Sequence, residues 1–275
     1  MPPRLDQIGF WSEVKLDIVR EYAAAYSTGL SAQRGLRGHL YIDGFAGSGV
    51  HISKRTGRYV SGSPLNALLV EPPFREFHLI DMDGDKASTL RRLTADRSDV
   101  FVHEGNCNQI LLETVFPRAR YDDYRRALCL LDPYGLHLNW EVIHTAGQMR
   151  SIEIILNFSV MDMNMNVLRR TPDKSQSSQE ERMDAFWGDR SWRDAAYVKT
   201  RGLFEEMEEK VSNEAVAHAF QKRLRDVAGF KFVPDSIPMR NSKGAVIYYL
   251  FFASANRTGA KIVSEIFKKY RDKGA

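Results

Sequence analysis

The sequence predicts an α/β fold built on a mostly parallel seven-stranded sheet that ends in an antiparallel hairpin. Between residues 39 and 157, apolar segments of strand length alternate with helical segments, an order that favours parallel strands joined by right-handed crossovers. The five strands expected there are near-continuous apolar runs, as in sheets that helices cover on both faces. A polar turn at residues 241–244 separates two further apolar segments and predicts the hairpin.

The chain opens with a predicted amphipathic helix at residues 11–26, in which Val14, Ile18 and Tyr22 recur every four residues. The five strands are then expected at residues 39–43, 76–81, 100–103, 126–132 and 152–157. Helices are expected at residues 65–70, 85–93, 109–116 and 139–147, and Ser63 and Pro64 suit the start of the first of these. Residues 50–62 are expected to form a loop.

Residues 160–229 interrupt the alternation and predict a helical insertion. Residues 169–181 are polar, which favours a loop, and the helices after them carry aromatic residues suited to a core: Phe186, Trp187, Trp192, Phe204 and Phe220. The hairpin strands are expected at residues 230–239 and 245–253, and a final helix at 259–270. We therefore predict a single domain, residues 1–275, with an N-terminal helical extension (1–38) and the insertion at 160–229.

The composition excludes several classes of protein. Hydrophobic residues make up 43% and charged residues 27% of the chain, which excludes wholesale disorder. No apolar run approaches the roughly 20 residues of a membrane span, and no apolar signal segment is present, so a cytoplasmic protein without membrane contact is expected. Cys107 and Cys129 form no disulfide framework and no Cys/His cluster, so no metal is expected. The net charge of +4 favours a polyanionic partner, although mildly basic enzymes without one are common.

The strongest motif is a glycine-rich turn directly after the first strand. Asp43 ends the strand, and the turn follows as Gly44, Phe45, Ala46, Gly47, Ser48 and Gly49. Such a turn is either a tight connection or a place where backbone N–H groups approach a ligand. Val50 and His51 stand where a P-loop needs Lys and Ser or Thr, and Ile52 stands where a dinucleotide fingerprint needs a small residue. A carboxylate at Asp43 would repel a pyrophosphate but can bind the cationic end of S-adenosylmethionine, so the turn predicts that cofactor.

Polar residues after the next two strands fit the same cofactor. Asp81 ends the second strand, where a carboxylate can accept hydrogen bonds from both ribose hydroxyls. Asp83 and Asp85 follow closely, and any of the three acids could instead stabilise a helix N-terminus. Asn106, after the third strand, suits either the adenine amino group or a Gly-Asn turn. The adjacent Cys107 completes the predicted cofactor-binding set, with packing as its alternative role.

The fourth strand ends in Asp132, Pro133, Tyr134 and Gly135, which predicts the catalytic pair. In nitrogen-directed methyltransferases a polar residue before a proline accepts hydrogen bonds from the target amine, and the aromatic after it stacks on the target base. Asp132 and Tyr134 are therefore the predicted catalytic residues, and a plain turn is the alternative. Asn157 ends the fifth strand and either lines the same cleft or caps a neighbouring backbone group.

Two groups of basic residues flank this region. Lys54, Arg55 and Arg58 lie beside the predicted cofactor site, where they could contact a phosphate backbone. The second group flanks the opposite end of the fourth strand, where we expect a solvated face, and consists of Arg118, Arg120, Arg125 and Arg126.

Together these residues resemble the three-Cys-motif partner proteins (TcmP) over most of the chain. The resemblance is carried by Lys15, Leu16 and Tyr22 and by the segments 41–49, 62–64, 78–81, 132–135, 157–158, 186–188 and 248–250. It implies a Rossmann-like class I methyltransferase fold and a radical-S-adenosylmethionine-like companion protein with three clustered cysteines. Asn106 departs from the commoner Asp of methyltransferases. The Asp-Pro-Tyr-Gly run also departs from the Asp-Pro-Pro-Tyr of adenine amino methyltransferases, so adenine is not carried over as the target.

The sequence therefore predicts an S-adenosylmethionine-dependent methyltransferase that modifies a nitrogen of a nucleic-acid base. Two alternatives stay open. One is methylation of a protein or peptide together with the three-Cys companion. The other is a non-catalytic partner that binds the cofactor only to organise that companion.

Overall fold

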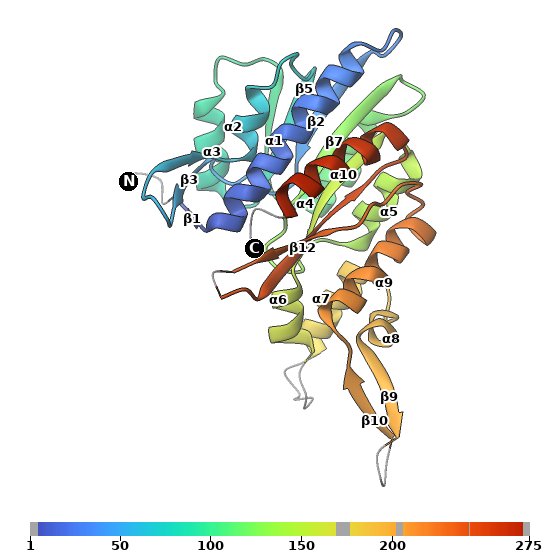
Figure 1. Cartoon of the computed structure of the whole chain (residues 1–275). Coiled ribbons are helices and arrows are strands. Elements are labelled where there is room, and N and C mark those ends of the chain that lie inside the picture. Colours follow the sequence, from blue (N-terminus) through green and yellow to red (C-terminus); the bar gives the residue numbers. More distant parts are fainter. Residues whose placement is uncertain (1–4, 169–176, 202–205, 242, 272–275) are drawn as a thin grey trace.

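The computed structural model of the chain describes residues 5–168, 177–201, 206–241 and 243–271 (Figure 1). Its centre is a seven-stranded sheet in the order β11-β12-β8-β7-β2-β5-β6. The strands are β2 (Gly38–Asp43), β5 (Glu76–Asp81), β6 (Val100–Glu104), β7 (Arg125–Leu131), β8 (Ile152–Phe158), β11 (Ile237–Arg240) and β12 (Val246–Ala253). Strand β12 runs antiparallel to both β8 and β11, and the other pairs are parallel. The predicted α/β class, the mostly parallel sheet and the C-terminal antiparallel hairpin are thus confirmed.

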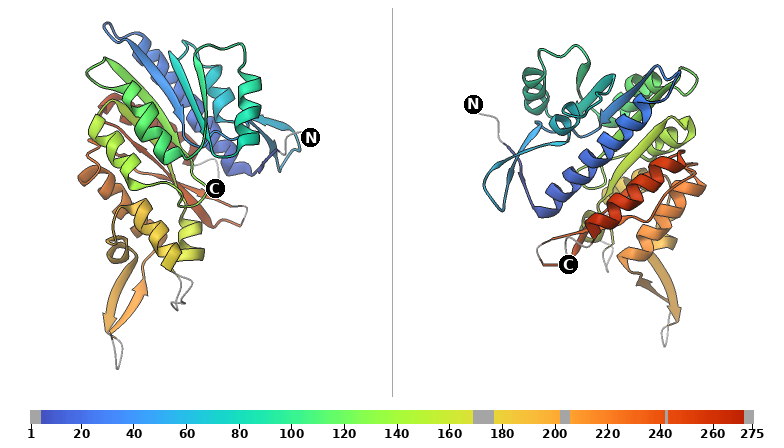
Figure 2. Two further views of the ribbon diagram at one scale, coloured as in Figure 1. Left: turned by 180° about the vertical axis from the view of Figure 1, so that it is seen from behind. Right: turned by 45° about the horizontal axis from the view of Figure 1, so that its top comes forward.

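Helices cover both faces of this sheet, as the continuous apolar strands indicated. One face packs against α1 (Phe10–Ser31), α2 (Ser63–Leu68), α3 (Gly84–Leu93) and α10 (Arg257–Arg271). The other packs against α4 (Cys107–Ile110), α5 (Trp140–Met149) and α9 (Asn213–Asp226). Adjacent strand residues alternate between the two cores, so that Tyr41 belongs to the first and Ile42 to the second. Helices α1 and α10 lie side by side, and Lys269 binds Glu21 at 2.8 Å (Figure 2).

The first hairpin strand is shorter than predicted. Only Ile237–Arg240 pairs with β12, whereas the expected strand covered residues 230–239. Phe232 forms an isolated bridge with Ser254, and Pro234, which follows soon after, has no N–H to extend the ladder. The carbonyl of Val233 instead accepts a hydrogen bond of 3.0 Å from the buried side chain of Gln221.

Residues 50–62 are not a loop, and that prediction is wrong. They form a hairpin of β3 (Val50–Ser53) and β4 (Tyr59–Ser61), and β1 (Gln7–Ile8) adds to β3 to make a small three-stranded sheet. Ser53 tightens the hairpin turn because its hydroxyl accepts 3.2 Å hydrogen bonds from the backbone N–H groups of Arg55 and Thr56. The hairpin places the N-terminal segment and His51 near the end of the main sheet at which the parallel strands finish.

The insertion is only partly helical, which corrects the prediction. It contains α6 (Val160–Asp162), the π-helical turn η3 (Met163–Val167), α7 (Ser177–Trp187) and α8 (Trp192–Ala196). The hairpin of β9 (Tyr197–Arg201) and β10 (Glu206–Lys210) follows before α9 and projects from the body of the molecule (Figure 1). Residues 177–181, expected in a loop, begin α7, whereas residues 169–176 and Phe204 lie outside the described residues.

An aromatic cluster joins the insertion to the main sheet. The ring of Phe158 in β8 stacks on Phe186 of α7 at 5.3 Å between centroids. Phe220 of α9 packs 4.9 Å from Phe158 and 5.4 Å from Phe186. Aromatic contacts of this kind add to the free energy gained by burying the rings. The predicted core roles of Phe186 and Phe220 are therefore confirmed.

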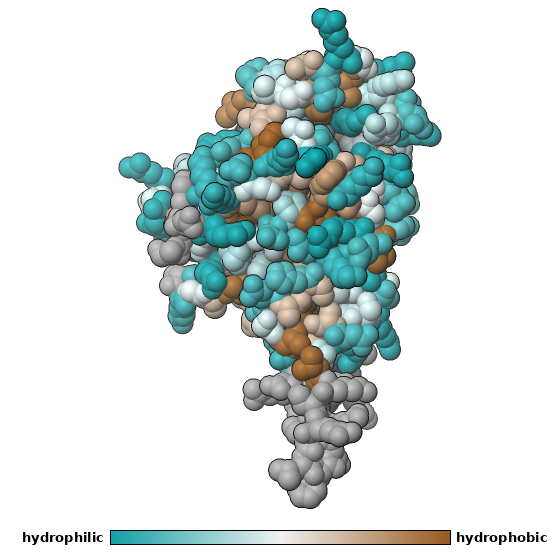
Figure 3. Space-filling view, turned by 45° about the vertical axis from the view of Figure 1, so that its right-hand side comes forward, coloured by the Kyte–Doolittle hydropathy of each residue, from teal (hydrophilic) through white to brown (hydrophobic). Residues whose placement is uncertain are grey.

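One face of the body is mostly polar. In Figure 3 the hydrophilic residues dominate the visible face, and apolar residues appear singly or in small groups. Within the described ranges, no helix combines the length and the hydropathy needed to cross a membrane.

Candidate functional site

Two adjoining cavities open where the parallel strands end. The first cavity, of about 650 Å³, is lined among others by Gly44, Phe45, Asp81, Asn106 and Cys107. The second cavity, of about 460 Å³, is lined among others by Phe45, Ala46, Gly47, Asp132, Tyr134 and Asn157. Phe45 and Tyr134 line both, so the two spaces meet at these residues. Most of the predicted site residues therefore lie around one continuous region.

The glycine turn is held between the two neighbouring strands. The N–H of Gly44 donates to the carbonyl of Leu130 at 2.9 Å, and the N–H of Ala46 donates to the carbonyl of Ile80 at 2.8 Å. A side chain at Gly44 would not fit, because its Cβ would lie 2.9 Å from the sulfur of Cys107. The turn thus carries residues 44–47 to the cavities in a fixed position.

The second half of the turn, Ser48 and Gly49, lines neither cavity. The Ser48 hydroxyl donates to the carbonyl of Val50 at 3.0 Å, which leads the chain into strand β3. Gly47 and Gly49 have φ values of 64° and 83°, a backbone region in which glycine avoids the strain of other residues. The two glycines therefore shape the turn. A ligand contact by Ser48 or Gly49 stays a prediction.

Asp81 is the acid at the end of β5 that faces the first cavity. Its Oδ2 accepts a 2.8 Å hydrogen bond from the N–H of Gly47, and its Oδ1 accepts one of 2.9 Å from the N–H of Asp83. Asp83 also borders the cavity, but its carboxylate caps α3 by accepting the N–H groups of Asp85 and Lys86. Asp85 lies in the first turn of α3 outside the cavity. Of the three acids, Asp81 therefore links the glycine turn to the cavity.

Asn106 and Cys107 lie on the floor of the same cavity, at the start of α4. The Oδ1 of Asn106 accepts a 2.9 Å hydrogen bond from the N–H of Asn108 and caps the helix. Among the described residues the Nδ2 of Asn106 has no partner, so it is available as a donor. Cys107 is buried, and burial raises the pKa of its thiol, so the thiol stays protonated and acts as a packing group at neutral pH.

Asp43 lies behind the turn and lines neither cavity. Its carboxyl group is fully buried and accepts hydrogen bonds from the N–H of Phe45 at 3.3 Å and the hydroxyl of Tyr41 at 3.4 Å. Burial raises its pKa to about 7, although these donors oppose the shift. A direct contact between Asp43 and a cofactor therefore stays a prediction, while a role in holding the turn is visible.

Asp132 is held from both sides in the second cavity. Its Oδ1 accepts a 2.8 Å hydrogen bond from the Nδ2 of Asn157, and its Oδ2 forms an ion pair with the Nζ of Lys15 in α1. Burial lowers the pKa of Lys15, but the charge of Asp132, its hydrogen bond with Lys15 and the nearby Tyr248 and Asp43 together more than offset this, and the net shift is upward. The Oδ1 of Asn157 is buried and has no hydrogen-bond partner within the described part of the chain. The cavity thus holds an oriented carboxylate beside an unused amide acceptor.

Tyr134 stands at the junction of the two cavities and is 65% exposed. Its hydroxyl receives a 3.2 Å hydrogen bond from the Nζ of Lys86 and donates to Asp6 at 3.3 Å. Lys86 also forms a 2.8 Å ion pair with Asp6 and lies 5.3 Å from the centre of the tyrosine ring. These contacts join the N-terminal segment, α3 and the turn after β7, and they set the position of the ring.

Sequence reasoning missed several of these partners. Lys15 was not assigned to the site, although it lies between Trp11 and Ile18 on the apolar face of the first helix, where an unpaired lysine would be costly. Its position on this apolar face was therefore a signal in the sequence that Lys15 has an acidic partner. Nothing in the spacing along the chain pointed to the contacts of Asp6 and Lys86 with Tyr134.

The basic residues take different positions. Lys54, Arg55 and Arg58 are exposed at the tip of the β3–β4 hairpin. At the opposite end of the sheet, Arg118 and Arg125 each bind Glu76 at 2.9 Å, so they are ion-paired as well as solvated. In the ranges that the structure describes, no three His, Cys, Asp or Glu side chains converge as a metal site.

Comparisons with known proteins add little to this geometry. No protein-family model matches the chain, and no curated protein does. Among solved structures, the chain is similar to protein LPL1258 of Legionella pneumophila, described by the family model DUF519, with 10% identity over 94% of each chain and a TM-score of 0.49. It is also similar to yhhF of Escherichia coli, a candidate methyltransferase, with 17% identity over 86% of each chain and a TM-score of 0.36. At these identities and TM-scores neither likeness bears on the chemistry, which follows from the residues described above.

Proposed function

We propose that the protein is an S-adenosylmethionine-dependent methyltransferase of the Rossmann-like class I type. The observation that carries the proposal is the position of Asp81 and the glycine turn around the first cavity, directly beside the second cavity with Asp132. The strand order, with an antiparallel β12 between β8 and β11, supports the same fold type. A ligand that spans both cavities would present its nucleoside to the first and its reactive end to the second.

The first cavity fits a nucleoside in size and chemistry. Its volume of about 650 Å³ lies in the range of small-molecule sites. Each oxygen of Asp81 accepts one backbone N–H, and its second lone pair can accept a ribose hydroxyl. Met82, 71% exposed, offers an apolar surface to a base, and the Nδ2 of Asn106 offers a donor. Bound here, S-adenosylmethionine would supply a methyl group on a positively charged sulfur.

The second cavity fits an amine as the methyl acceptor. Asp132, with its oxygens oriented by Lys15 and Asn157, would accept a hydrogen bond from one N–H of the amine. The Oδ1 of Asn157 would accept the other N–H, which satisfies its unused capacity. Two acceptors on one amino group direct its lone pair toward the methyl donor, and this positioning lowers the barrier to transfer. The fixed ring of Tyr134 offers an aromatic face at the mouth of the site.

A nucleic-acid base is the substrate that this arrangement favours. Strand β3 contributes His51 to the second cavity, and the turn that follows β3 carries the exposed Lys54, Arg55 and Arg58. None of these three residues lines the second cavity, but cationic side chains on the hairpin that carries His51 can bind the phosphate backbone of a strand that enters it. The aromatic face of Tyr134 could then stack on a base turned out of its helix.

The cofactor half of the proposal is tested by calorimetric titration with S-adenosylhomocysteine. We expect micromolar binding to the wild type and at least tenfold weaker binding to Asp81→Asn. The matched control is Asp85→Asn, because Asp85 lies four residues away outside the cavity and should bind normally. No binding to the wild type, or equal binding to Asp81→Asn, would contradict the proposal.

The catalytic half is tested with tritium-labelled S-adenosylmethionine and total RNA, DNA or peptide as the acceptor. We expect transfer to a nucleic acid, and Asp132→Asn should abolish transfer while cofactor binding persists. Transfer to peptide alone would move the substrate to the protein class, acting together with a three-Cys companion.

One observation favours a second candidate, a non-catalytic partner of the three-Cys companion. Lys15 already neutralises the carboxylate that the methyl acceptor would use. If Asp132→Asn leaves the cellular function of the protein intact while Asp81→Asn removes it, cofactor binding without methyl transfer is the function.

A further inference from the structure

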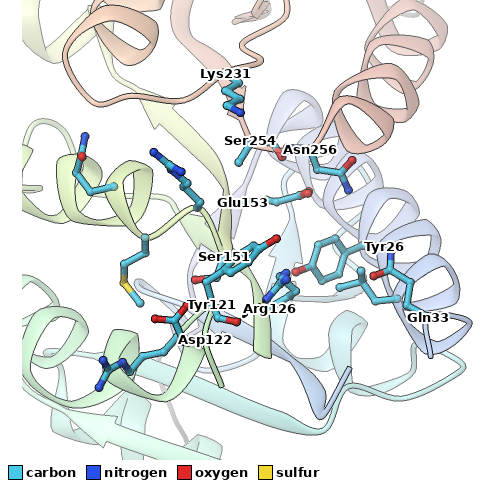
Figure 4. A pocket seen from close by; sticks show the side chains of 16 residues that line it. Tyr26, Gln33, Tyr121, Asp122, Arg126, Ser151, Glu153, Lys231, Ser254 and Asn256 are labelled. Carbon is cyan, nitrogen blue, oxygen red and sulfur yellow. Dashed lines mark hydrogen bonds between the residues drawn. The ribbon is translucent and has the colours of Figure 1, made fainter. Parts of the chain in front are cut away.

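A third cavity opens at the opposite end of the parallel strands, where β7 and β8 begin (Figure 4). Its volume is about 830 Å³, and none of the described residues that line it also lines the first or second cavity. Its walls come from α1, the start of β7, the end of α5, the start of β8 and the segment after β12. The proposed methyl transfer makes no use of this space.

Two buried hydroxyl groups in its wall have no hydrogen-bond partner among the described residues. They belong to Tyr26, which is 7% exposed, and Ser151, which is 2% exposed. In Figure 4 the hydroxyl of Tyr26 points toward Arg126 and the interior of the cavity. A buried polar group without a partner costs about 1–3 kcal/mol, so a pair of them at one cavity indicates donors kept for a ligand.

Arg126 contributes a positive charge beside these hydroxyls. Its guanidinium carbon lies 3.8 Å from the centre of the Tyr121 ring, and its Nη1 donates to the carbonyl of Arg125 at 2.7 Å. No carboxylate in the described part of the chain lies within 4 Å of the guanidinium, so its charge is not neutralised by an ion pair. The planar group is thus held in place with its remaining N–H donors available.

The wider lining is also positive. Arg120, Arg150 and Lys231 join Arg126, whereas the acids that the described residues contribute to the lining are Asp122 and Glu153. Glu153 is buried and accepts a hydrogen bond from the hydroxyl of Tyr22. Its carboxyl group is neutral in a large fraction of molecules near neutral pH, since burial raises its pKa to about 7. An anion in the cavity would therefore meet more attraction than repulsion.

We propose that the third cavity binds a small organic phosphate, whose phosphate group contacts Tyr26, Ser151 and Arg126. A phosphate monoester carries up to two negative charges and several acceptor oxygens, which match a guanidinium and two hydroxyl donors. The cavity is much larger than a phosphate ion and leaves room for an organic part of sugar or nucleoside size. The proposal is independent of the methyltransferase proposal, because the two regions share no residue.

The test is calorimetric titration with ribose 5-phosphate, with ribose as the uncharged control. We expect ribose 5-phosphate to bind and ribose not to bind. Arg126→Gln should weaken binding at least tenfold, and Tyr26→Phe, which removes only the hydroxyl, should weaken it at least threefold. Arg20→Gln makes the same charge change at an exposed position of α1 and should bind as the wild type does.

Circular dichroism of each variant shows whether it is folded, and Tyr26→Phe keeps the test decisive if Arg126→Gln does not fold. The proposal is overturned if the wild type gives no binding at millimolar ribose 5-phosphate. It is equally overturned if ribose binds as well as its phosphate, or if the folded variants bind like the wild type.

Discussion

Replacing Glu153 by Gln should stabilise the protein at pH 8 and leave its stability nearly unchanged near pH 4. Glu153 lies in β8 with 6% of its surface exposed, and the hydroxyl of Tyr22 donates to it. Burial, only partly opposed by this hydrogen bond, raises its pKa from an ordinary value of 4.5 to about 7. Glutamine has the same size and resembles the protonated acid, so it fills the same space without a charge to bury.

The magnitude follows from proton binding. The unfolded chain loses the Glu153 proton near pH 4.5, whereas the folded protein keeps it up to about pH 7. Between these values the folded state binds more protons, so the wild type loses stability as the pH rises, by about 1.4 kcal/mol for each pH unit. Over the whole interval the loss amounts to about 3 kcal/mol, and Glu153→Gln removes it. Asp43, whose pKa burial also raises to about 7, affects both proteins equally and cancels in the difference.

Urea unfolding followed by circular dichroism at several pH values between 4 and 8 measures this difference. The free energy of unfolding of Glu153→Gln, minus that of the wild type, should grow from near zero at pH 4 to about 3 kcal/mol at pH 8. The exposed Glu265→Gln in α10 is the matched control and should show no such growth. A difference that stays constant with pH would refute the reasoning, because it would mean that Glu153 ionises alike in both states.

Three further predictions concern single side chains. Gly147→Ala should lower the free energy of unfolding by about 2 kcal/mol, because the added Cβ would overlap the backbone carbonyl of Ala228. Gly29→Ala adds the same atom in open space within helix α1 and should raise the free energy of unfolding by about 0.5–1 kcal/mol. Urea titration measures the stability of both variants, and equal effects would refute the packing argument. Lys15→Met should lower the kcat of methyl transfer at least tenfold but change S-adenosylhomocysteine affinity less than threefold, because Lys15 orients Asp132 in the second cavity, whereas the nucleoside of the cofactor is proposed to bind in the first. A loss of affinity as large as the loss of kcat would contradict that role.

Four of the five parallel strands, all except β6 at the side of the sheet, were predictable because they are buried on both faces. Strand β5 was predicted with its observed bounds, and β2 and β6 differ from prediction by one residue each. A continuous apolar run bounded by polar turns is a strong local signal for such strands. The β3–β4 hairpin lacks that signal, since most of its residues are half-exposed or exposed and its third strand, β1, comes from the distant N-terminal segment.

The site residues that directly follow a strand could be predicted from the sequence. Their partners from distant parts of the chain could not. Asp81, Asn106 and Asp132 were found because parallel strands bring their carboxyl ends to one edge. The partner of Asp132 is Lys15, which is 117 residues away in the chain. Only the packing of α1 onto the sheet brings these two together, and no local spacing encodes that.

The place of β12 inside the sheet has a consequence for protein synthesis. The ribosome makes β12 after β8 and after the whole insertion, yet in the finished sheet β12 pairs directly with β8. Until residues 246–253 have left the exit tunnel, the apolar strand β8 has a free edge, and such edges readily pair with other chains. A premature stop codon just before Val246 should therefore yield a product that chaperones retain or proteases remove, even though most of the proposed catalytic region would already have been translated.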